Sequence, residues 1–314
     1  MIYISIIIIL SIVAFIYCKI AIKYNIADTP DLRRSHNTPT IRGVGIIFPL
    51  SVVMWFYIYE ISSIYFLLGL VLISMVSFLD DLFNLNPINR IIAHILSSIF
   101  LLLQFDLFNF NLLFLFILVI LIVGWFNSFN FMDGINGITS LYSSLCLFTL
   151  YIVGYSRNIY DLQLILIVLL SLLVFSFLNF RKQAIAFAGD VGSISLSYII
   201  AFLMIALILN TNEISYILFL SVYGIDSSIT IIQRLFKGEN IFKPHRTHLY
   251  QYLANEKKWS HLLISIIYFF IQLFINLIVL FVILPSEYSV LLSMLVLFIL
   301  VLIYLIIKRK VSKF

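Results

Sequence analysis

Long apolar runs separated by short polar segments make up most of this 314-residue chain. A bilayer core about 30 Å thick needs about 20 apolar residues per helix, whereas a barrel strand needs only about ten. Backbone polar groups in lipid must be satisfied within the spanning segment, so helices are expected. The sequence therefore predicts an all-α, polytopic membrane protein. Its hydropathy indicates eleven spans, near residues 2–22, 44–60, 62–79, 88–104, 110–127, 138–154, 163–179, 192–209, 215–232, 262–283 and 289–307.

Composition excludes a water-soluble fold. Hydrophobic residues make up 63% of the chain and charged residues 11%, and the mean hydropathy is +1.15. Soluble domains are roughly half apolar and a quarter charged. The net charge is +5, but the basic residues lie mostly in the segments between spans, so this charge does not indicate a nucleic-acid partner. The first run lacks a basic leader and a small-residue cleavage site, so we interpret it as a retained span. Cys18 and Cys146 lie within apolar runs and predict neither a disulfide nor a metal site.

The placement of Lys and Arg predicts the orientation in the membrane. If the N-terminus lies outside, all of the 19 basic residues except Arg157 fall in segments on the inner side. The positive-inside rule therefore predicts an outer N-terminus and an inner C-terminus. No segment is large enough for a soluble domain, so residues 1–314 are expected to form one membrane-embedded domain. The predicted cytoplasmic segments lie near residues 23–43, 80–88, 128–137, 180–191 and 233–260.

Four polar clusters fall on the predicted cytoplasmic side, at the ends of apolar runs. An Asp at mid-span costs roughly 2.5–3.5 kcal/mol, so acids near hydrocarbon are functional candidates. The presence of so many acids and histidines in one layer of the membrane predicts a functional site in that layer. The clusters are Asp80-Asp81-Leu82-Phe83-Asn84, Asn127 to Gly134, Gly189-Asp190-Val191-Gly192-Ser193, and His245-Arg246-Thr247-His248.

The first cluster places two carboxylates side by side. Asp80 and Asp81 repel each other at the edge of hydrocarbon unless a cation or a proton relieves the repulsion. A Mg²⁺ site or a general base is one interpretation, because Mg²⁺ takes one or two carboxylates together with substrate phosphates. A solvated helix cap, with Asn84 one turn later, is the alternative.

The second cluster has polar residues at every third position. Asn127, Asn130, Asp133 and Asn136 would lie along one side of a helix end, where Gly134 loosens the backbone. Amides and a carboxylate at such a bend can hold a nucleotide or a phosphate. An ordinary Asn/Gly turn between two spans is the alternative.

The third cluster opens the eighth predicted span. Its N–H groups and the positive end of the helix dipole favour an anion, which Asp190 would repel unless a divalent cation bridges the two. An Asp that only caps the helix is the alternative.

The fourth cluster, His245, Arg246 and His248, can bind phosphate or move a proton, and the segment supplies no third zinc ligand. A loop that faces solvent or lipid headgroups is the alternative. Asp226 lies within the ninth span, where a carboxylate is either functional or paired with a neighbouring helix.

Together the clusters resemble, in order and sidedness, the motifs of the polyprenyl-phosphate N-acetylhexosamine-1-phosphate transferases, glycosyltransferase family 4. The resemblance runs from Asp28 to about Tyr252. The matching motifs are Asp28-Thr29-Pro30 with Arg33, His36 and Gly43-Val44-Gly45, the paired aspartates with Asn84, Asn127 to Gly137, Gly189 to Ser193, and His245 to Gln251.

The chain also departs from the family pattern. Asn136 replaces the usual second aspartate of its motif, and Ile41 stands where a proline often precedes the Arg-Gly pair. The His-Arg-Thr-His form resembles the branch that initiates O-antigen, capsule or other surface glycans more than the peptidoglycan translocase, which carries three histidines.

The resemblance implies an enzyme of the bacterial inner membrane with a cytoplasmic active site. It would transfer an N-acetylhexosamine 1-phosphate from a UDP-sugar to undecaprenyl phosphate, releasing UMP. The phospho-N-acetylmuramoyl-pentapeptide translocase, a transporter and a lipid-binding protein are the alternatives, and a homodimer is left open.

The expected site residues follow. We expect Mg²⁺, with Mn²⁺ as an alternative, on Asp190 and Asp81. Asp80 or Asp81 would accept a proton or hold the lipid phosphate. The expected substrate-binding residues are Asn84, Asn127, Asn130, Asp133, Asp226, His245, Arg246, His248, Arg42 and His36.

Overall fold

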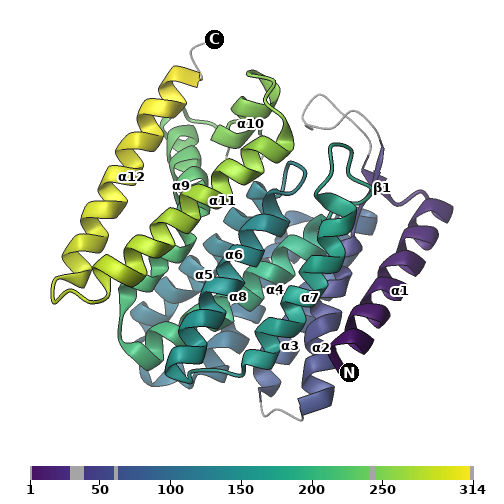
Figure 1. Ribbon diagram of the computed structural model, residues 1–314, viewed down its shortest axis with the longest axis horizontal. Coiled ribbons are helices and arrows are strands. Elements are labelled where there is room, and N and C mark those ends of the chain that lie inside the picture. The colour runs from purple at the N-terminus through teal and green to yellow at the C-terminus, as the bar shows by residue number, and fades with distance from the viewer. Residues whose placement is uncertain (1, 29–38, 60–62, 241–244, 312–314) are drawn as a thin grey trace.

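The computed structural model describes residues 2–28, 39–59, 63–240 and 245–311. Within these ranges the chain is almost entirely helical, and its membrane-length helices cross from one end of the molecule to the other (Figure 1). This confirms the predicted polytopic all-α fold. The main helices are α1 (Ile2–Lys23), α2 (Ile47–Tyr59), α3 (Ile64–Phe83), α4 (Pro87–Gln104), α5 (Leu112–Met132), α6 (Ile138–Arg157), α7 (Leu162–Asn179), α8 (Gly189–Thr211), α9 (Ser221–Phe236), α10 (Leu249–Asn255), α11 (His261–Ile278) and α12 (Ser289–Val311).

The predicted spans correspond closely to these helices. In the described residues, 10 helices are long and apolar enough to cross a membrane, and the apolar segment Val44–Tyr59 is shorter. Two of the ten are composite, because η3 (Ile214–Leu220) continues into α9 and α11 continues into the π-helical turn η4 (Val279–Ile283). α1 begins at one end of the bundle and α12 finishes at the other (Figure 1). This placement requires an odd number of crossings, which the ten helices give together with the shorter segment Val44–Tyr59.

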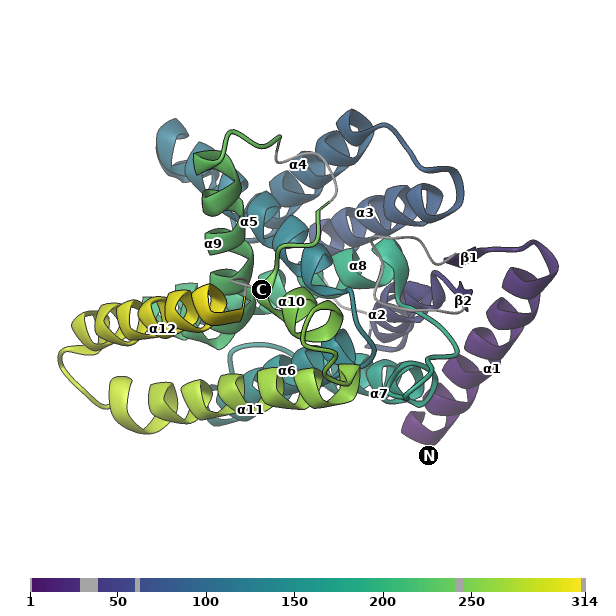
Figure 2. The ribbon, with the colours of Figure 1, turned by 90° about the horizontal axis from the view of Figure 1, so that it is seen from above.

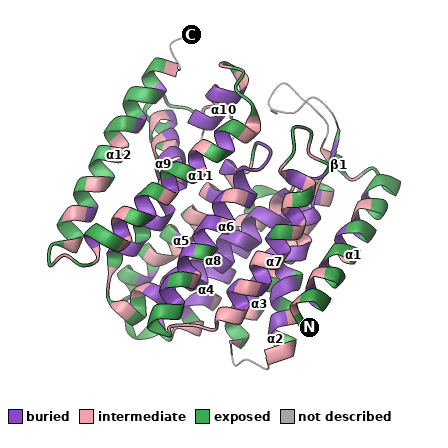
Figure 3. Cartoon of the chain, viewed as in Figure 1, coloured by how far each residue is buried: buried purple, intermediate pink, exposed green. Residues whose placement is uncertain are grey.

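Helix α8 forms the centre of the bundle. In its most apolar stretch 89% of the residues are buried, against 11% in α12. α8 contacts α2, α3, α5 and α6, so its N-terminus is surrounded by protein. Figure 3 shows this contrast between a buried interior and the exposed, apolar faces of α1 and α12. The apolar faces of these outer helices are those expected to contact lipid.

The segment after α1 is fastened to the start of α8. A two-residue ribbon pairs β1 (Ala27–Asp28) with β2 (Thr40–Ile41), and Ile41 also forms a parallel bridge with Ala186. The N–H of Gly45 then donates to the Ala188 carbonyl at 3.0 Å. A Cβ on Gly45 would lie 2.3 Å from the Cα of Gly192, so only glycine permits this approach. These contacts bring Arg42 to the α8 N-terminus.

The long segment before α11 contains a helix that hydropathy did not indicate. The amide oxygen of the Gln251 side chain accepts a hydrogen bond from the His248 N–H at 3.2 Å, which closes the first turn of α10. The α10 helix lies over one end of the bundle, as the view from above shows (Figure 2). Its contacts with α11 and α12 fix the histidine segment against the membrane helices.

Candidate active site

Three carboxylates and two guanidinium groups meet where α3, α4 and α8 approach one another. Arg42 contacts Asp81 at 2.6 Å and Asp190 at 2.8 Å. Arg90 contacts Asp80 at 3.0 Å and Asp190 at 3.2 Å. Asp190 is therefore shared by both arginines. These five residues, which we call the acidic cluster, join segments that are more than a hundred positions apart in sequence.

Asp81 is the most enclosed member of the cluster, with a side chain that is 0% exposed. Its Oδ1 accepts the N–H of Asp190 at 2.9 Å, and its Oδ2 accepts the N–H of Val191 at 3.0 Å. These N–H groups belong to the first turn of α8, which has no partners for them within the helix. Asp81 thus serves as a side-chain cap from α3 for the central helix, with Arg42 balancing its charge.

Asp190 has a different set of partners. Its Oδ1 faces Arg42 and also accepts a hydrogen bond from the Asn130 amide at 3.2 Å, while its Oδ2 faces Arg90. Asn130 donates in addition to the Ser193 hydroxyl at 2.9 Å. The helix prediction for the Gly-Asp-Val-Gly-Ser motif is confirmed, and Asp190 lies in its first turn.

Asp80 lies on the more open side of the cluster. Its Oδ1 caps the Leu85 N–H at 2.7 Å, and its Oδ2 faces Arg90. One guanidinium therefore lies against an oxygen of Asp80 and an oxygen of Asp190, so these two carboxylates converge on a single cation position. Sequence reasoning did not select Arg90. The signal that could have indicated Arg90 is that it is the one arginine or lysine of α4, the helix that follows the paired aspartates.

Arg42 is held in its charged form by the acids around it. Burial alone would lower the pKa of its guanidinium, but the carboxylates of Asp190 and Asp81 outweigh burial and raise the pKa. The Tyr17 hydroxyl donates to the Arg42 carbonyl at 2.8 Å and fixes the backbone there. A permanent positive charge thus lies beside Asp81 and Asp190.

The three asparagines of the second sequence cluster have separate roles. Asn130 joins the cluster, whereas the Asn127 amide donates to the Val123 carbonyl at 2.8 Å within its own helix. The Asn136 amide donates to the Arg181 carbonyl at 2.9 Å and fastens the α5–α6 and α7–α8 loops together. Asn136, the departure from the family pattern, is thus a buried structural amide.

Asp133 follows α5 directly and accepts a hydrogen bond from the Thr139 hydroxyl. Burial raises the pKa of the Asp133 carboxyl to about 6; the Thr139 hydrogen bond lowers the pKa and the nearby Asp190 raises it. The carboxyl is thus within electrostatic reach of the acidic cluster and is ionised at neutral pH.

Asp226 and His248 are each other's partners. Both side chains are 1% exposed, and His248 Nδ1 lies 3.4 Å from Asp226 Oδ1. Asp226 also accepts hydrogen bonds from the Tyr268 hydroxyl at 2.6 Å and the Tyr304 hydroxyl at 2.8 Å. The Leu249 N–H donates to the same carboxylate at 3.0 Å. The pairing interpretation of Asp226 is therefore the one that the contacts support, and its partners fill the directions in which a substrate could approach.

The histidine segment lies against the end of α5. The Tyr250 hydroxyl donates to the Phe131 carbonyl at 2.8 Å, and the ring centre of His245 lies 5.9 Å from that of Phe131. Burial, together with the nearby His248, lowers the pKa of His245 to about 4, so its imidazole is neutral at pH 7. Arg246 is half-buried in the same segment. The fourth cluster thus borders the last turn of α5 at Phe131, two residues before Asp133, rather than the acidic cluster itself.

Asn84 and His36 were also expected to bind substrate. Asn84 ends α3 in a left-handed conformation, with φ of 48°, and its side chain is exposed. It terminates the helix, and its side chain does not pair with any residue of the cluster. His36 lies outside the described residues.

Carboxylate oxygens that could bind a metal ion converge in the acidic cluster, but they are paired with Arg42 and Arg90. Among the described residues, no group of three or more His, Cys, Asp or Glu side chains is arranged to hold a metal ion. The shared position of Arg90 between Asp80 and Asp190 nevertheless fits a cation bound by two carboxylate oxygens, which is the donor type that Mg²⁺ prefers. Both oxygens of Asp81 are occupied by the α8 N–H groups, so Asp81 fits a metal less well.

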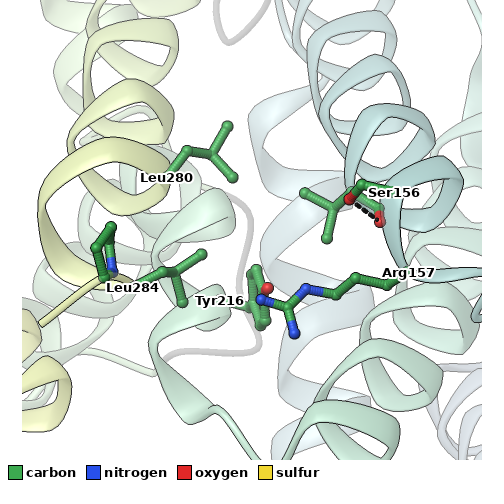
Figure 4. A pocket seen from close by; sticks show the side chains of 7 residues that line it. Ser156, Arg157, Tyr216, Leu280 and Leu284 are labelled. Atoms are coloured by element: carbon green, nitrogen blue, oxygen red, sulfur yellow. Dashed lines mark hydrogen bonds between the residues drawn. The ribbon is translucent and has the colours of Figure 1, made fainter. Parts of the chain in front are cut away.

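A cavity of about 250 Å³ lies elsewhere, between the end of α6 and η3 and η4. Figure 4 shows its wall, with Arg157 beside Tyr216 and the side chains of Leu280 and Leu284 opposite. No carboxylate lines it, and Arg157 is the one basic residue that the sequence placed on the other side of the membrane. The acidic cluster is therefore the better candidate for the active site.

Comparison with known proteins identifies the class. Residues 63–208 match glycosyl transferase family 4, a range that includes Asp80, Asp81, Asn130 and Asp190. The resemblance predicted from the sequence is thus confirmed. The chain is a polytopic membrane protein that carries a glycosyl transferase family 4 domain, built from α3 to α8.

Individual relatives fall in two groups. A phospho-N-acetylmuramoyl-pentapeptide-transferase of Streptococcus pneumoniae serotype 2 is 24% identical over 251 residues, covering 70% of this chain and 76% of that protein. A second such transferase, from Streptococcus mutans, is 30% identical over 154 residues, 44% of each chain. A probable undecaprenyl-phosphate N-acetylglucosaminyl 1-phosphate transferase of Bacillus subtilis is 28% identical over 256 residues, 75% of this chain and 71% of that protein.

Proposed function

We propose that this protein transfers an N-acetylhexosamine 1-phosphate from a UDP-sugar to undecaprenyl phosphate. An oxygen of the lipid phosphate attacks the phosphorus next to the sugar, the bond from that phosphorus to the uridine phosphate breaks, and UMP leaves. A lipid-linked sugar pyrophosphate remains. The observation that carries this proposal is the acidic cluster, in which two arginines and three aspartates meet at one end of a bundle of membrane-length helices.

The reaction brings two polyanions together, so the site must supply positive charge. Phosphoryl transfer depends on positioning and on electrostatic stabilisation of oxygens around the transferred phosphorus. Arg42 and Arg90 are half-buried and lie on opposite sides of Asp190. When phosphates enter, these guanidinium groups can exchange carboxylate partners for phosphate oxygens without leaving the site. The helix dipole of α8 adds positive potential at the same point.

Magnesium is the cofactor that this ligand chemistry supports. Asp190 and Asp80 would hold the ion, because their oxygens already converge on one cation position, with Arg90 displaced toward phosphate. When bound, Mg²⁺ would neutralise the phosphates and stabilise the leaving UMP. This assignment replaces Asp81 of the sequence-based expectation by Asp80. We assign Asp81 a positioning role, because it holds the backbone of Asp190.

The donor sugar nucleotide is expected on the side of α5. Asn130 and Asp133 lie between the acidic cluster and the histidine segment, so a nucleotide there could contact both. His245 and Arg246 then offer a neutral imidazole and a guanidinium to the sugar or its phosphates. Asp226, His248, Asn127 and Asn84 serve better as supports, because their contacts stay within the protein or leave the site.

We also propose that the protein initiates a surface glycan. Relatives include phospho-N-acetylmuramoyl-pentapeptide-transferases and a probable undecaprenyl-phosphate N-acetylglucosaminyl 1-phosphate transferase, so homology alone leaves the sugar open. The His-Arg-Thr-His segment supports a UDP-N-acetylhexosamine donor and initiation of O-antigen, capsule or a related glycan. A cytoplasmic site follows from the distribution of basic residues.

A donor panel tests the proposal. Purified protein is incubated with undecaprenyl phosphate, Mg²⁺ and a series of UDP-sugars, including UDP-N-acetylglucosamine, UDP-N-acetylgalactosamine and UDP-N-acetylmuramoyl-pentapeptide. UMP release and the lipid product are followed together. We expect turnover with an N-acetylhexosamine donor and none with the pentapeptide donor. Turnover only with the pentapeptide would instead make the protein a peptidoglycan translocase.

A further inference from the structure

A second cavity lies outside the acidic cluster. It has a volume of about 560 Å³ and lies between the C-terminal ends of α9 and α12, with Thr247 of the histidine segment and Tyr252 of α10 on its wall. Figures 1 and 2 show α9 and α12 as neighbours beside α10. None of the residues assigned to the transfer reaction lines this cavity.

The cavity has an excess of positive charge. Four basic residues line it, Arg234, Lys237, Lys308 and Arg309, against one acid, Glu239. Arg234 and Glu239 pair at 2.9 Å and neutralise each other. Lys237 and Arg309 form no ion pair with any other described residue, and both are exposed. Three positive charges therefore face the same space.

Lys308 is the most unusual of these cations. It is 4% exposed on a helix whose other faces are apolar and open, and its ammonium donates to the Thr230 hydroxyl at 2.6 Å. A buried ammonium is costly unless it is solvated or paired with an anion. The Thr230 hydroxyl and the Tyr304 ring, whose centre lies 5.3 Å from the ammonium, are both neutral. The nearby Asp226 carboxylate already accepts three other hydrogen bonds, so an anion in the cavity would complete the surroundings of the ammonium.

The surroundings of the cavity indicate the kind of anion. Phe236 and Leu305 line it together with the basic residues, and both are exposed large hydrophobics. The cavity therefore opens where apolar helix faces give way to basic side chains, at the level of lipid headgroups. Basic pockets between membrane helices on the cytoplasmic side bind anionic phospholipid headgroups.

We propose that this cavity binds the phosphodiester headgroup of an anionic membrane phospholipid. Lys237, Lys308 and Arg309 contact the phosphate, and the acyl chains lie along the exposed faces of α9 and α12. This site shares no lining residue with the transfer reaction, and the proposal does not rest on the function proposed above.

A bound headgroup would also order the histidine segment. Thr247 lines the cavity, and its hydroxyl lies 3.0 Å from His245 Nδ1. The α12 residue Tyr304 donates to Asp226, which in turn holds the Leu249 N–H. A lipid that clamps α9 against α12 therefore stabilises the same network, and it should raise the temperature of unfolding.

Native mass spectrometry and thermal unfolding of the whole protein in detergent test the proposal. The probes are phosphatidylglycerol, phosphatidylcholine, undecaprenyl phosphate and free glycerol 3-phosphate. We expect preferential binding of phosphatidylglycerol and a rise in melting temperature that phosphatidylcholine does not give. The double variant Lys237→Gln/Arg309→Gln should lose about tenfold in affinity for phosphatidylglycerol and most of the thermal shift. Both residues are exposed, so the variant is expected to fold.

Lys310→Gln is the matched control. Lys310 is an exposed lysine next to Arg309 on α12 and does not line the cavity, so its variant should bind phosphatidylglycerol like the parent protein. Equal loss in both variants would mean general surface charge and would overturn the site. Equally tight binding of glycerol 3-phosphate would make this a soluble-phosphate site, and preferential binding of undecaprenyl phosphate would make it an acceptor site. Either result contradicts the proposal.

Discussion

The side chain of Asp81 holds the backbone of Asp190, with 2.9 Å between the Asp81 Oδ1 and the Asp190 nitrogen. One acid of the cluster thus sets the position of another, through the first turn of α8. The paired aspartates therefore differ in their tasks although they are adjacent in sequence. Asp81 faces inward and supports the central helix, while Asp80 faces Arg90 on the open side.

This difference predicts distinct results for two neighbouring substitutions. Asp81→Asn replaces an acceptor by an amide N–H that faces the α8 N–H groups, and it leaves Arg42 with less compensation. We expect a loss of roughly 2–4 kcal/mol in stability together with lost activity. Asp80→Asn should lower turnover by at least about a hundredfold with a much smaller effect on stability. Thermal unfolding and UMP release separate the two effects.

These two variants test whether Asp80 acts in the reaction while Asp81 supports the central helix. If Asp80→Asn lowers the melting temperature as much as Asp81→Asn, the two acids share a structural role. If Asp81→Asn keeps normal stability, its role as a cap for α8 is wrong.

A glycine beside Asp81 gives a second prediction. Gly189 has a φ of 73°, and a Cβ there would lie 2.4 Å from Asp81 Oδ2. Gly189→Ala should therefore displace the carboxylate and reduce both stability and turnover. Gly238 is the matched control, because its φ is 69° and no atom lies within 4 Å of an added Cβ. Gly238→Ala should cost only about 1 kcal/mol of backbone strain. Equal effects of the two substitutions on turnover would contradict the crowding of Asp81.

The raised pKa of Asp133 predicts a pH dependence of stability. With a pKa of about 6 in the folded protein and about 4 in the unfolded chain, Asp133 binds a proton in the folded state only, throughout that window. Stability therefore falls as the pH rises from about 4 to 6, by about 3 kcal/mol from this group. Asp133→Asn keeps an acceptor for Thr139 and should unfold at a higher temperature than the parent protein at pH 7. The difference should vanish at pH 4; an offset that is the same at both pH values would show that the carboxyl does not titrate as described.

Hydropathy predicted nearly all of the fold, because each membrane helix is encoded locally by its own apolar run. It also selected Asp80, Asp81, Asp190 and Asn130, since charged and amide groups at the edge of hydrocarbon stand out in sequence, whereas Arg42 was expected only from the family resemblance. It could not predict which acid faces α8, because that depends on the packing of α3 against α8. The Asp226–His248 pair was missed for the same reason, as its members lie on different elements. The helix α10 was missed because its seven residues carry no membrane-length pattern.

The charge distribution predicts the orientation in the membrane. A cysteine at Glu287, an exposed residue between η4 and α12, should react with an impermeant reagent on intact cells. A tag after Phe314 should be reached only after the membrane is opened, because α12 ends in Lys308, Arg309 and Lys310. The reverse pattern of labelling would place the acidic cluster on the outer side, away from a cytosolic UDP-sugar.

In the proposed reaction, the phosphate next to the sugar moves to the lipid together with the sugar. This transfer can be measured with UDP-N-acetylglucosamine, or the donor that the panel selects, radiolabelled in that phosphate and incubated with undecaprenyl phosphate, Mg²⁺ and the purified protein. We predict that the label enters the lipid fraction while unlabelled UMP is released, and that Asp190→Asn abolishes both although the variant remains folded. Label that stays in solution as UDP while the sugar alone enters the lipid would contradict the account, as would normal transfer by Asp190→Asn.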